Sequence, residues 1–157
     1  MATKITKIEW TDKTWNPVTG CTKISQGCAH CYAEVMSRRL KAMGLGVTVE
    51  AQTSKPRIDC LRVLEAPIRF LSCEPLMEDL GELDLTNIDW VIVGGESGPQ
   101  ARPMKEEWVL NIKRQTEAQE AAFFFKQWGT WGADGVKRNK HKNGKMIGGK
   151  VLQAMPV

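Results

Sequence analysis

The sequence predicts an α/β fold with a mostly parallel sheet, and two observations lead to this prediction. Short apolar runs alternate along the chain with longer segments whose apolar residues recur at helical spacing. One of the runs, Trp90–Val93, is apolar throughout, which suits a strand buried on both faces of a sheet. Alternation of strands and helices is typical of parallel sheets, in which a helix connects each pair of strands.

The first predicted helix covers residues 33–43, and Gly44 is suited to end it. Its apolar residues recur at helical spacing: Ala33, Met36, Leu40 and Met43. Residues 1–31 are expected to form a short strand and an ordered loop. Residues 47–49 are a candidate strand, and residues 56–65 a second helix. One side of that helix carries Ile58, Leu61 and Leu64.

Three further strands and a long helix are predicted in the second half of the chain. The strands are residues 68–72, 90–93 and 122–125. The helix begins at Pro103, continues to about Gln119 and is anchored by Trp108, Val109 and Ile112. The tail after Gly129 is rich in glycine and lysine, and no element is assigned to it.

Each predicted strand runs into polar or glycine residues at its carboxyl end. These exits are Glu50–Gln52, Cys73–Pro75, Gly94–Gly98 and Lys126–Trp128. Ligands of parallel α/β folds bind beyond the carboxyl ends of the strands, so four exits would converge on one pocket if the strands are neighbours. Ordinary turns are also polar, so the convergence carries more weight than any single exit.

Size and composition are those of one soluble domain. The chain has 157 residues, of which 42% are hydrophobic and 25% are charged. No apolar run approaches the length of a membrane span, and the N-terminus lacks the apolar stretch of a signal peptide. We therefore expect a cytoplasmic protein without a membrane partner. In that compartment the five cysteines favour metal or redox chemistry over disulfides.

The net charge of +4 is modest, and much of it lies in the run Lys137–Lys145. Such a run is able to contact phosphates. A solvated, flexible loop is the more common explanation and the one we favour from the sequence.

Cys21, Cys28 and Cys31 are spaced to hold a metal or an iron–sulfur cluster. A cluster on three cysteines leaves one iron open for a small molecule. Tetrahedral zinc would need a fourth ligand, for which the chain offers Cys60, Cys73 and His141. Three free buried thiols are the structural alternative. We favour ligation, and iron–sulfur over zinc.

Other candidate site residues lie at the strand exits. Gly94 and Gly95 allow a ligand to approach the backbone, and Glu96 can accept hydrogen bonds from an amine, although glycine pairs after strands are often simple turns. Glu74 is either a ligand contact or a turn residue. Near Lys126, two tryptophans are able to stack on a base, but the edge of the core is the favoured place for them: Trp128 and Trp131.

Seven ordered motifs resemble the phage three-cysteine-motif family, which is found on bacteriophages and prophages and is related to radical S-adenosylmethionine (SAM) proteins. The motifs are Ile8–Asp12, Trp15–Cys21, Gly27–Glu34, Phe70–Pro75, Trp90–Gly98, Ala101–Pro103 and Phe124–Gly129. The resemblance implies a partial (β/α) barrel in one domain, residues 1–157. Its parts would be the cysteine loop and first helix (1–46), the β/α units (47–128) and the tail (129–157).

The resemblance also implies cofactors and roles for the site residues. A [4Fe-4S] cluster would be held by Cys21, Cys28 and Cys31, and SAM would chelate its open iron and be cleaved to a carbon radical. Residues Gly94, Gly95 and Glu96 would contact SAM or substrate. The candidate catalytic residues are Glu74 and Lys126, lining the pocket of a viral protein in the host cytoplasm.

The sequence departs from that family at one place. Relatives carry several dozen more residues between the first helix and the strand at 47–50, where two strands of the barrel are expected. A shortened barrel has an open sheet edge through which the chain would form a homo-oligomer or recruit a partner strand. Two functions follow: a radical-SAM-like iron–sulfur enzyme of unknown substrate, and a non-catalytic phage effector that binds a host protein or nucleic acid.

Overall fold

The computed structural model describes residues 44–156, all of which belong to one unit of the chain. The predicted helix at 33–43 and the three cysteines of the N-terminal loop lie outside the described residues. Within the described part, no helix is long and apolar enough to cross a membrane.

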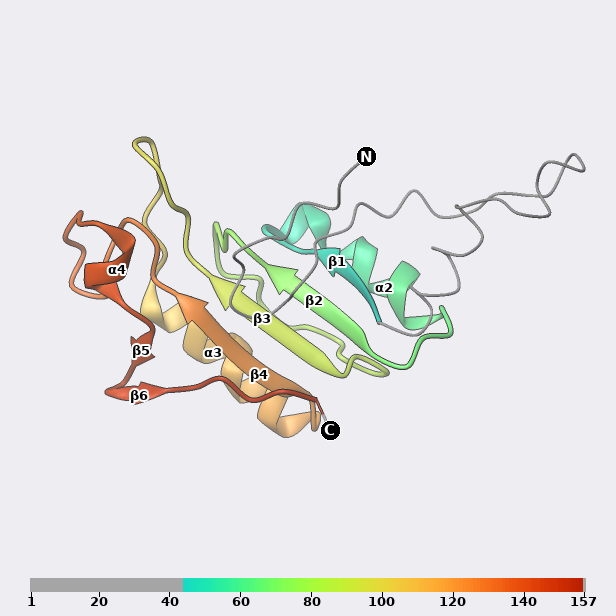
Figure 1. The fold of residues 1–157 in the computed structure, drawn as a ribbon. Helices are drawn as coiled ribbons and strands as arrows, with labels where there is room; N and C mark the ends of the chain where they lie inside the picture. The colour runs from blue at the N-terminus through green and yellow to red at the C-terminus, as the bar shows by residue number, and fades with distance from the viewer. Residues whose placement is uncertain (1–43, 157) are drawn as a thin grey trace, which may run out of the picture. The chain divides into compact units, whose positions relative to one another are not determined.

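The main sheet has four strands, all parallel, in the order in which they follow along the chain (Figure 1). They are β1 (Leu45–Thr48), β2 (Arg69–Cys73), β3 (Trp90–Gly94) and β4 (Ala122–Gln127). This arrangement confirms the predicted α/β class and the parallel sheet. Each strand overlaps the predicted one and differs from it by only one or two residues at its ends.

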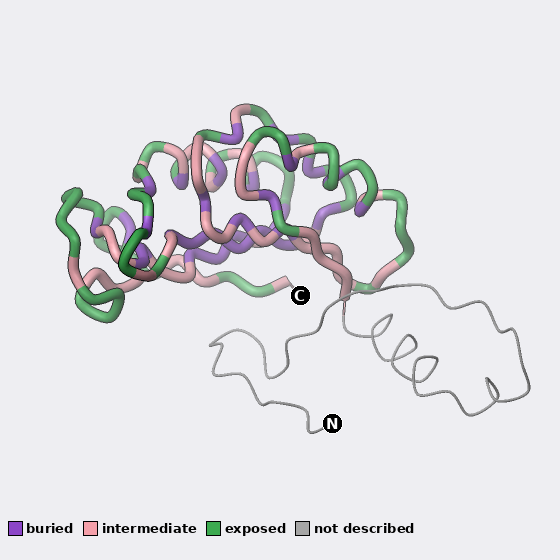
Figure 2. The backbone as a smooth tube through the Cα atoms, turned by 90° about the horizontal axis from the view of Figure 1, so that it is seen from above, coloured by how far each residue is buried: buried purple, intermediate pink, exposed green. Residues whose placement is uncertain are grey.

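The helices that connect the strands lie on one face of the sheet (Figure 2). The 3-10 turn η2 (Gln52–Ser54) and α2 (Pro56–Arg62) follow β1, and α3 (Glu106–Ala118) connects β3 to β4. Buried residues of α2 and α3 pack against alternate residues of the strands: Ile58, Leu61, Val109, Ile112, Leu71, Cys73, Val91, Val93, Phe123 and Phe125. Consecutive parallel strands with helices on one face are the pattern of a (β/α) barrel segment, since doubly wound sheets carry helices on both faces.

The barrel is not closed within the described residues. There, β1 pairs with β2 alone, and the outer edge of β4 is covered by the C-terminal segment. The amide of Phe125 donates to the Leu152 carbonyl at 2.7 Å, and the amide of Ala154 donates to the Phe123 carbonyl at 3.0 Å. This antiparallel addition satisfies backbone groups that an edge strand would otherwise leave unpaired.

The two predicted helices that lie within the described residues are both shorter than expected. Helix α2 ends at Arg62 instead of residue 65, and Leu64, predicted on its apolar side, is 48% exposed. Pro67 disfavours helical geometry in the residue before it. The Leu64 carbonyl instead accepts a hydrogen bond of 2.7 Å from the Arg69 side chain, which stabilises the turn into β2. Helix α3 begins at Glu106, because the chain before it is extended.

The connection from β2 to β3 contains no regular helix, yet it contributes much of the core. Its buried residues are Leu76, Leu80, Leu83, Leu85 and Ile88. The backbone of this segment is hydrogen-bonded by two amide side chains, one from α3 and one from the residue directly after it. Gln115 accepts from the Leu83 amide at 2.6 Å, and Gln119 accepts from the Leu85 amide at 2.8 Å. The leucines therefore bury their side chains without leaving these backbone groups unpaired.

The tail after Gly129 is folded. It contains the one-turn helix α4 (Lys140–Asn143) and a small antiparallel hairpin of β5 (Met146–Ile147) and β6 (Lys150–Val151). The indole of Trp128, 2% exposed, donates to the Met146 carbonyl at 2.7 Å and joins the tail to the end of β4. Trp128 is thus a core residue, as favoured from the sequence.

Candidate functional site

The four strand exits lie along one edge of the sheet, because the strands are parallel neighbours. Backbone hydrogen bonds tie the exits together. The amide of Met77 donates to the Glu50 carbonyl at 3.0 Å, that of Leu76 to Gly94 at 2.9 Å, and that of Gly95 to Gln127 at 2.9 Å. The four exits are therefore neighbours along this edge, as the sequence predicts; that they line one pocket stays a prediction.

Glu74 and Lys126 form an ion pair at this edge. The Lys126 ammonium donates to Glu74 Oε2 at 2.8 Å, and the side chains of Lys126 and Glu74 are only 23% and 16% exposed, respectively. A register shift helps to place the lysine: Val93 pairs with Phe125, whereas Gly94 pairs with Gln127, so Lys126 is the extra residue of a bulge. Bulges of this kind redirect side chains and are frequent near active sites.

Gly94 lies beneath this ion pair. A Cβ at Gly94 would be 2.5 Å from Glu74 Oε1 and 3.1 Å from the carboxylate carbon. The glutamate therefore occupies the space that a side chain on β3 would fill. We conclude that one function of this glycine is to let a carboxylate from the end of β2 reach a lysine on β4.

The Glu74 carboxylate is electrostatically unusual. Burial raises its pKa above the ordinary value, and the hydrogen bond and charge of Lys126 work against that rise. Oε1 is buried and has no hydrogen-bond donor among the described residues. Buried carboxylate oxygens are normally paired, and an orphaned one calls for an explanation such as a bound ligand or ion. The pair is chemically suited to accept a hydrogen bond from an amine or amide N–H.

Gly95, the second glycine after β3, lies close to the backbone that follows β4. A Cβ at Gly95 would lie 1.9 Å from the Trp128 carbonyl oxygen, and one at Gly129 would lie 2.2 Å from that of Glu96. Gly129 also has a φ of +81°, which side chains rarely adopt. The β3 exit and the β4 exit thus cross backbone to backbone. Sequence reasoning did not identify Gly129, although a glycine directly after Trp128 is a visible signal.

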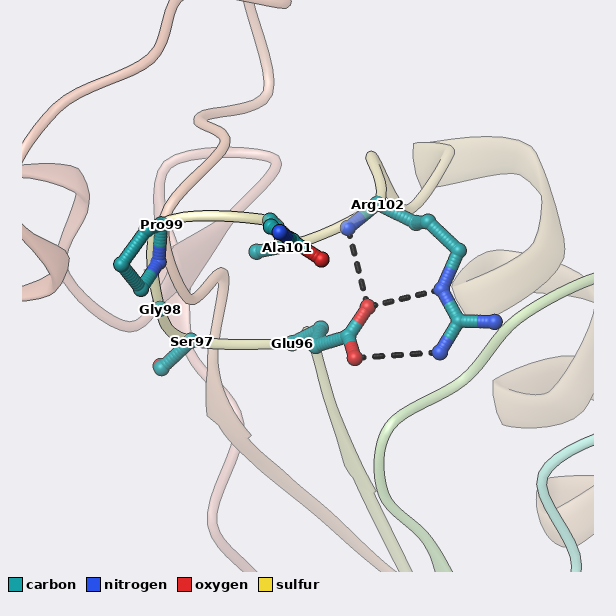
Figure 3. A pocket seen from close by; sticks show the side chains of 7 residues that line it. Glu96, Ser97, Gly98, Pro99, Ala101 and Arg102 are labelled. Carbon is teal, nitrogen blue, oxygen red and sulfur yellow. Dashed lines mark hydrogen bonds and ion pairs between the residues drawn. The ribbon is translucent and has the colours of Figure 1, made fainter.

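Glu96 pairs with Arg102 across a short loop (Figure 3). Its Oε2 accepts from the Arg102 amide and from Nε, both at 2.9 Å, and its Oε1 accepts from Nη2 at 3.0 Å. These hydrogen bonds lower the pKa of Glu96 to about 2. The arginine was not singled out from the sequence as a partner, because nothing in the chain before folding shows that the loop turns back on itself.

The same loop lines a shallow cavity of about 620 Å³. Its lining residues are Glu96, Ser97, Gly98, Pro99, Gln100, Ala101 and Arg102 (Figure 3). Thus Glu96 lines this cavity, whereas Glu74 and Lys126 do not. The half-buried Trp131 does not line the cavity but stabilises the loop, because its indole donates to the Ala101 carbonyl at 2.6 Å. The roles of Gly94, Gly95 and Glu96 toward a cofactor stay predictions.

One of the three candidate fourth ligands for zinc, Cys73, is poorly suited to that role. Cys73 is fully buried in the core beneath the helices, and burial raises the pKa of its thiol to about 12. Cys60 lies exposed on α2, as does His141 on α4. The described residues contain no group of three His, Cys, Asp or Glu side chains that could hold a metal ion. The predicted ligands Cys21, Cys28 and Cys31 lie outside the described residues.

Comparison with known proteins places the chain in a family. The matching family model is described as a protein of unknown function, DUF5131, and it covers residues 5–45 and 41–156. The chain belongs to this family. A search of curated proteins and a search of solved structures gave no match.

Proposed function

We propose that the protein is a radical-SAM-like iron–sulfur protein of phage origin, with its [4Fe-4S] cluster on Cys21, Cys28 and Cys31 and an unknown substrate. One observation in the described residues carries most weight: the half-buried Glu74–Lys126 pair at the carboxyl edge of the sheet, whose Glu74 Oε1 is buried and has no hydrogen-bond partner among those residues. The consecutive order of the strands and the helices on one face also suit the partial barrel of such proteins.

The Glu74–Lys126 pair is chemically suited to the amino end of SAM. The N–H groups of an amine donate hydrogen bonds, and Glu74 Oε1 is a buried acceptor beside a lysine that already holds the other oxygen. Glu74 would orient the amine, and Lys126 would keep the carboxylate in place. When bound, the cluster and SAM together would supply radical chemistry. Glu96 would meet a ligand only in company with Arg102, which already contacts both of its oxygens.

The test is anaerobic purification followed by iron and sulfide analysis, reduction, and addition of SAM. We expect about four irons per chain for the proposed cluster and formation of 5′-deoxyadenosine. A full cluster without SAM cleavage would overturn the enzyme proposal and leave the cluster standing. Zinc in place of iron would overturn both. Unchanged metal content in Cys28→Ala would show that the ligand assignment is wrong.

Two glutamate variants test the sheet-edge site separately from the cluster. Glu74→Gln keeps the shape and removes the charge, so it should weaken SAM binding by tenfold or more, since about 1.4 kcal/mol corresponds to tenfold. Its iron content should stay unchanged. Glu107→Gln removes the same charge from a side chain that is 72% exposed and does not contact Glu74 or Lys126, so this variant should bind SAM normally. Equal SAM affinity in both variants would exclude Glu74 from the site.

A second candidate function is a non-catalytic phage effector that binds a host protein or nucleic acid. One finding favours it: the family model matches in two separate stretches that meet at residues 41–45, where the sequence indicates a missing barrel segment. Such a protein would hold the cluster, or zinc, without cleaving SAM. The open edge of a shortened sheet would then support a homo-oligomer. Sedimentation equilibrium tests for this homo-oligomer, because a protein that is monomeric at all concentrations would exclude it.

A further inference from the structure

The cations of the described residues differ in whether the chain itself provides them with an acceptor. Every lysine and arginine from Lys55 to Arg138 forms a hydrogen bond or an ion pair with an oxygen atom of the chain. Within the same described part, the side chains of Lys140, Lys142 and Lys150 form none. The cations without an internal acceptor are therefore confined to the tail.

The positive charge of the protein is concentrated there as well. Residues 129–150 contain six of the 22 lysines and arginines but one of the 18 acids, so this segment carries +5 and the rest of the chain −1. The single acid, Asp134, is paired with Arg138 at 2.8 Å and does not neutralise the lysines that follow. This charge separation is not visible in the modest net charge of the whole chain.

Helix α4, which carries two of these lysines, is anchored on both sides. Asn139 caps it by accepting from the His141 amide at 3.0 Å. The Asn143 amide group donates to the carbonyls of Gly129 and Thr130 at 3.0 and 2.9 Å. The sequence favoured a flexible solvated loop here. The structure instead holds the lysines on a short, defined turn at the end of β4, so less conformational freedom is lost when they bind a ligand.

We infer that α4 forms a surface that binds the phosphodiester backbone of nucleic acid. Unpaired lysines bind phosphates with release of counterions, which makes such binding favourable without base recognition. Helix α4 has no apolar side chain, since its sequence is Lys-His-Lys-Asn. A docking site for a folded protein relies on buried aromatic or apolar anchors, and a membrane-surface helix needs an apolar face. The chemistry of this turn fits neither of these partners.

The experiment measures binding of the full-length protein to fluorescently labelled single-stranded and duplex oligonucleotides of mixed sequence. Anisotropy is followed between about 50 and about 200 mM salt. The variant Lys140→Gln/Lys142→Gln should bind about tenfold or more weakly at low salt. Its slope of log affinity against log salt should be reduced by roughly 1.4 on single strands, or about 0.7 for each phosphate contact. The matched control, Lys105→Gln/Arg114→Gln, removes two exposed cations near α3 and should retain the wild-type slope.

The outcomes are distinguishable from those of the proposed function, because the surface does not require the cluster or SAM. Stronger binding to one oligonucleotide form identifies the backbone geometry that fits α4. No binding at low salt would overturn the inference, as would equal slopes in the two double variants. A polyglutamate peptide that displaces the oligonucleotide and binds as tightly would also overturn it and indicate an acidic protein partner. Circular dichroism confirms that all variants are folded.

Discussion

Glu74 and Lys126 form a hydrogen-bonded ion pair of 2.8 Å, although a complete strand, β3, lies between β4, which carries Lys126, and β2, which Glu74 directly follows. The pair is possible because β3 ends in Gly94 and because a bulge sets Lys126 out of register. The helices cover the face of the sheet that carries Cys73, Val93 and Phe125. Successive residues of a strand point to opposite faces, so the residues that follow these three lie on the other face. Three strands thus combine to build one charged site.

Substitution of Gly94 by alanine should destabilise the protein by about 1–3 kcal/mol, the usual range for overpacking. The three atoms nearest to the new Cβ all belong to Glu74, at 2.5–3.2 Å. Gly94→Ala should therefore be much less harmful in a Glu74→Ala background. Urea unfolding of the four proteins measures this coupling as a double-mutant cycle. Additive effects would mean that the glutamate does not lie across the glycine.

Gly95→Ala should be more damaging than Gly94→Ala. Its Cβ would meet the Trp128 carbonyl oxygen at 1.9 Å, and this obstacle is backbone fixed in the sheet edge. A glutamate side chain can rotate away, whereas the backbone of Gln127–Gly129 cannot move without loss of its hydrogen bonds. We expect a loss of about 3 kcal/mol or more, or failure to fold. Urea midpoints that place Gly95→Ala above Gly94→Ala would contradict the close backbone crossing.

Glu96 should contribute stability that acid removes. Its folded pKa of about 2 lies below the ordinary value of 4.5, so the ionised form is favoured in the folded state. The contribution is complete above pH 4.5 and is lost as the pH falls through about 2. Glu96→Gln should consequently be less stable than wild type at pH 7, and the difference should shrink between these two pH values.

Urea unfolding at several pH values checks this prediction, and salt provides a second test. The Arg102 side chain is 57% exposed and that of Glu96 is 27% exposed, so added salt should also reduce the difference. Glu107→Gln is the control, because its lysine contact is long, at 3.7 Å. A difference between wild type and Glu96→Gln that is independent of pH would show that the ion pair does not stabilise the loop.

Much of the main sheet could be predicted from the sequence, because burial on both faces leaves a continuous apolar run in β3, and neighbouring strands carry similar runs. The strand exits could be predicted for the same reason. The connection between β2 and β3 could not be predicted in this way. Its leucines can be buried because Gln115 and Gln119 accept hydrogen bonds from its backbone amides, and these two side chains come near only when α3 packs on the sheet. Helix lengths were overestimated where extended or turn geometry interrupts an apolar pattern.

The candidate site was only partly predictable. Glu74 and Lys126 were each selected for their position at a strand end, but their contact joins residues 52 apart and depends on a bulge. The partnership of Glu96 with Arg102 depends on the turn at Gly98, whose φ of +131° glycine adopts readily. Register and loop closure are properties of the folded chain, and a single sequence does not reveal them.

Cys73 should resist alkylation in the folded protein, whereas Cys60 should react. Cys73 is fully buried, and its thiol pKa of about 12 leaves about one thiolate in ten thousand at pH 8. Cys60 is exposed on α2. Iodoacetamide treatment followed by peptide mass spectrometry reports the two residues separately, and in urea both should react. Protection of Cys73 should be unaffected by a metal chelator. Rapid labelling after chelation would instead indicate that Cys73 is the fourth ligand of a zinc site.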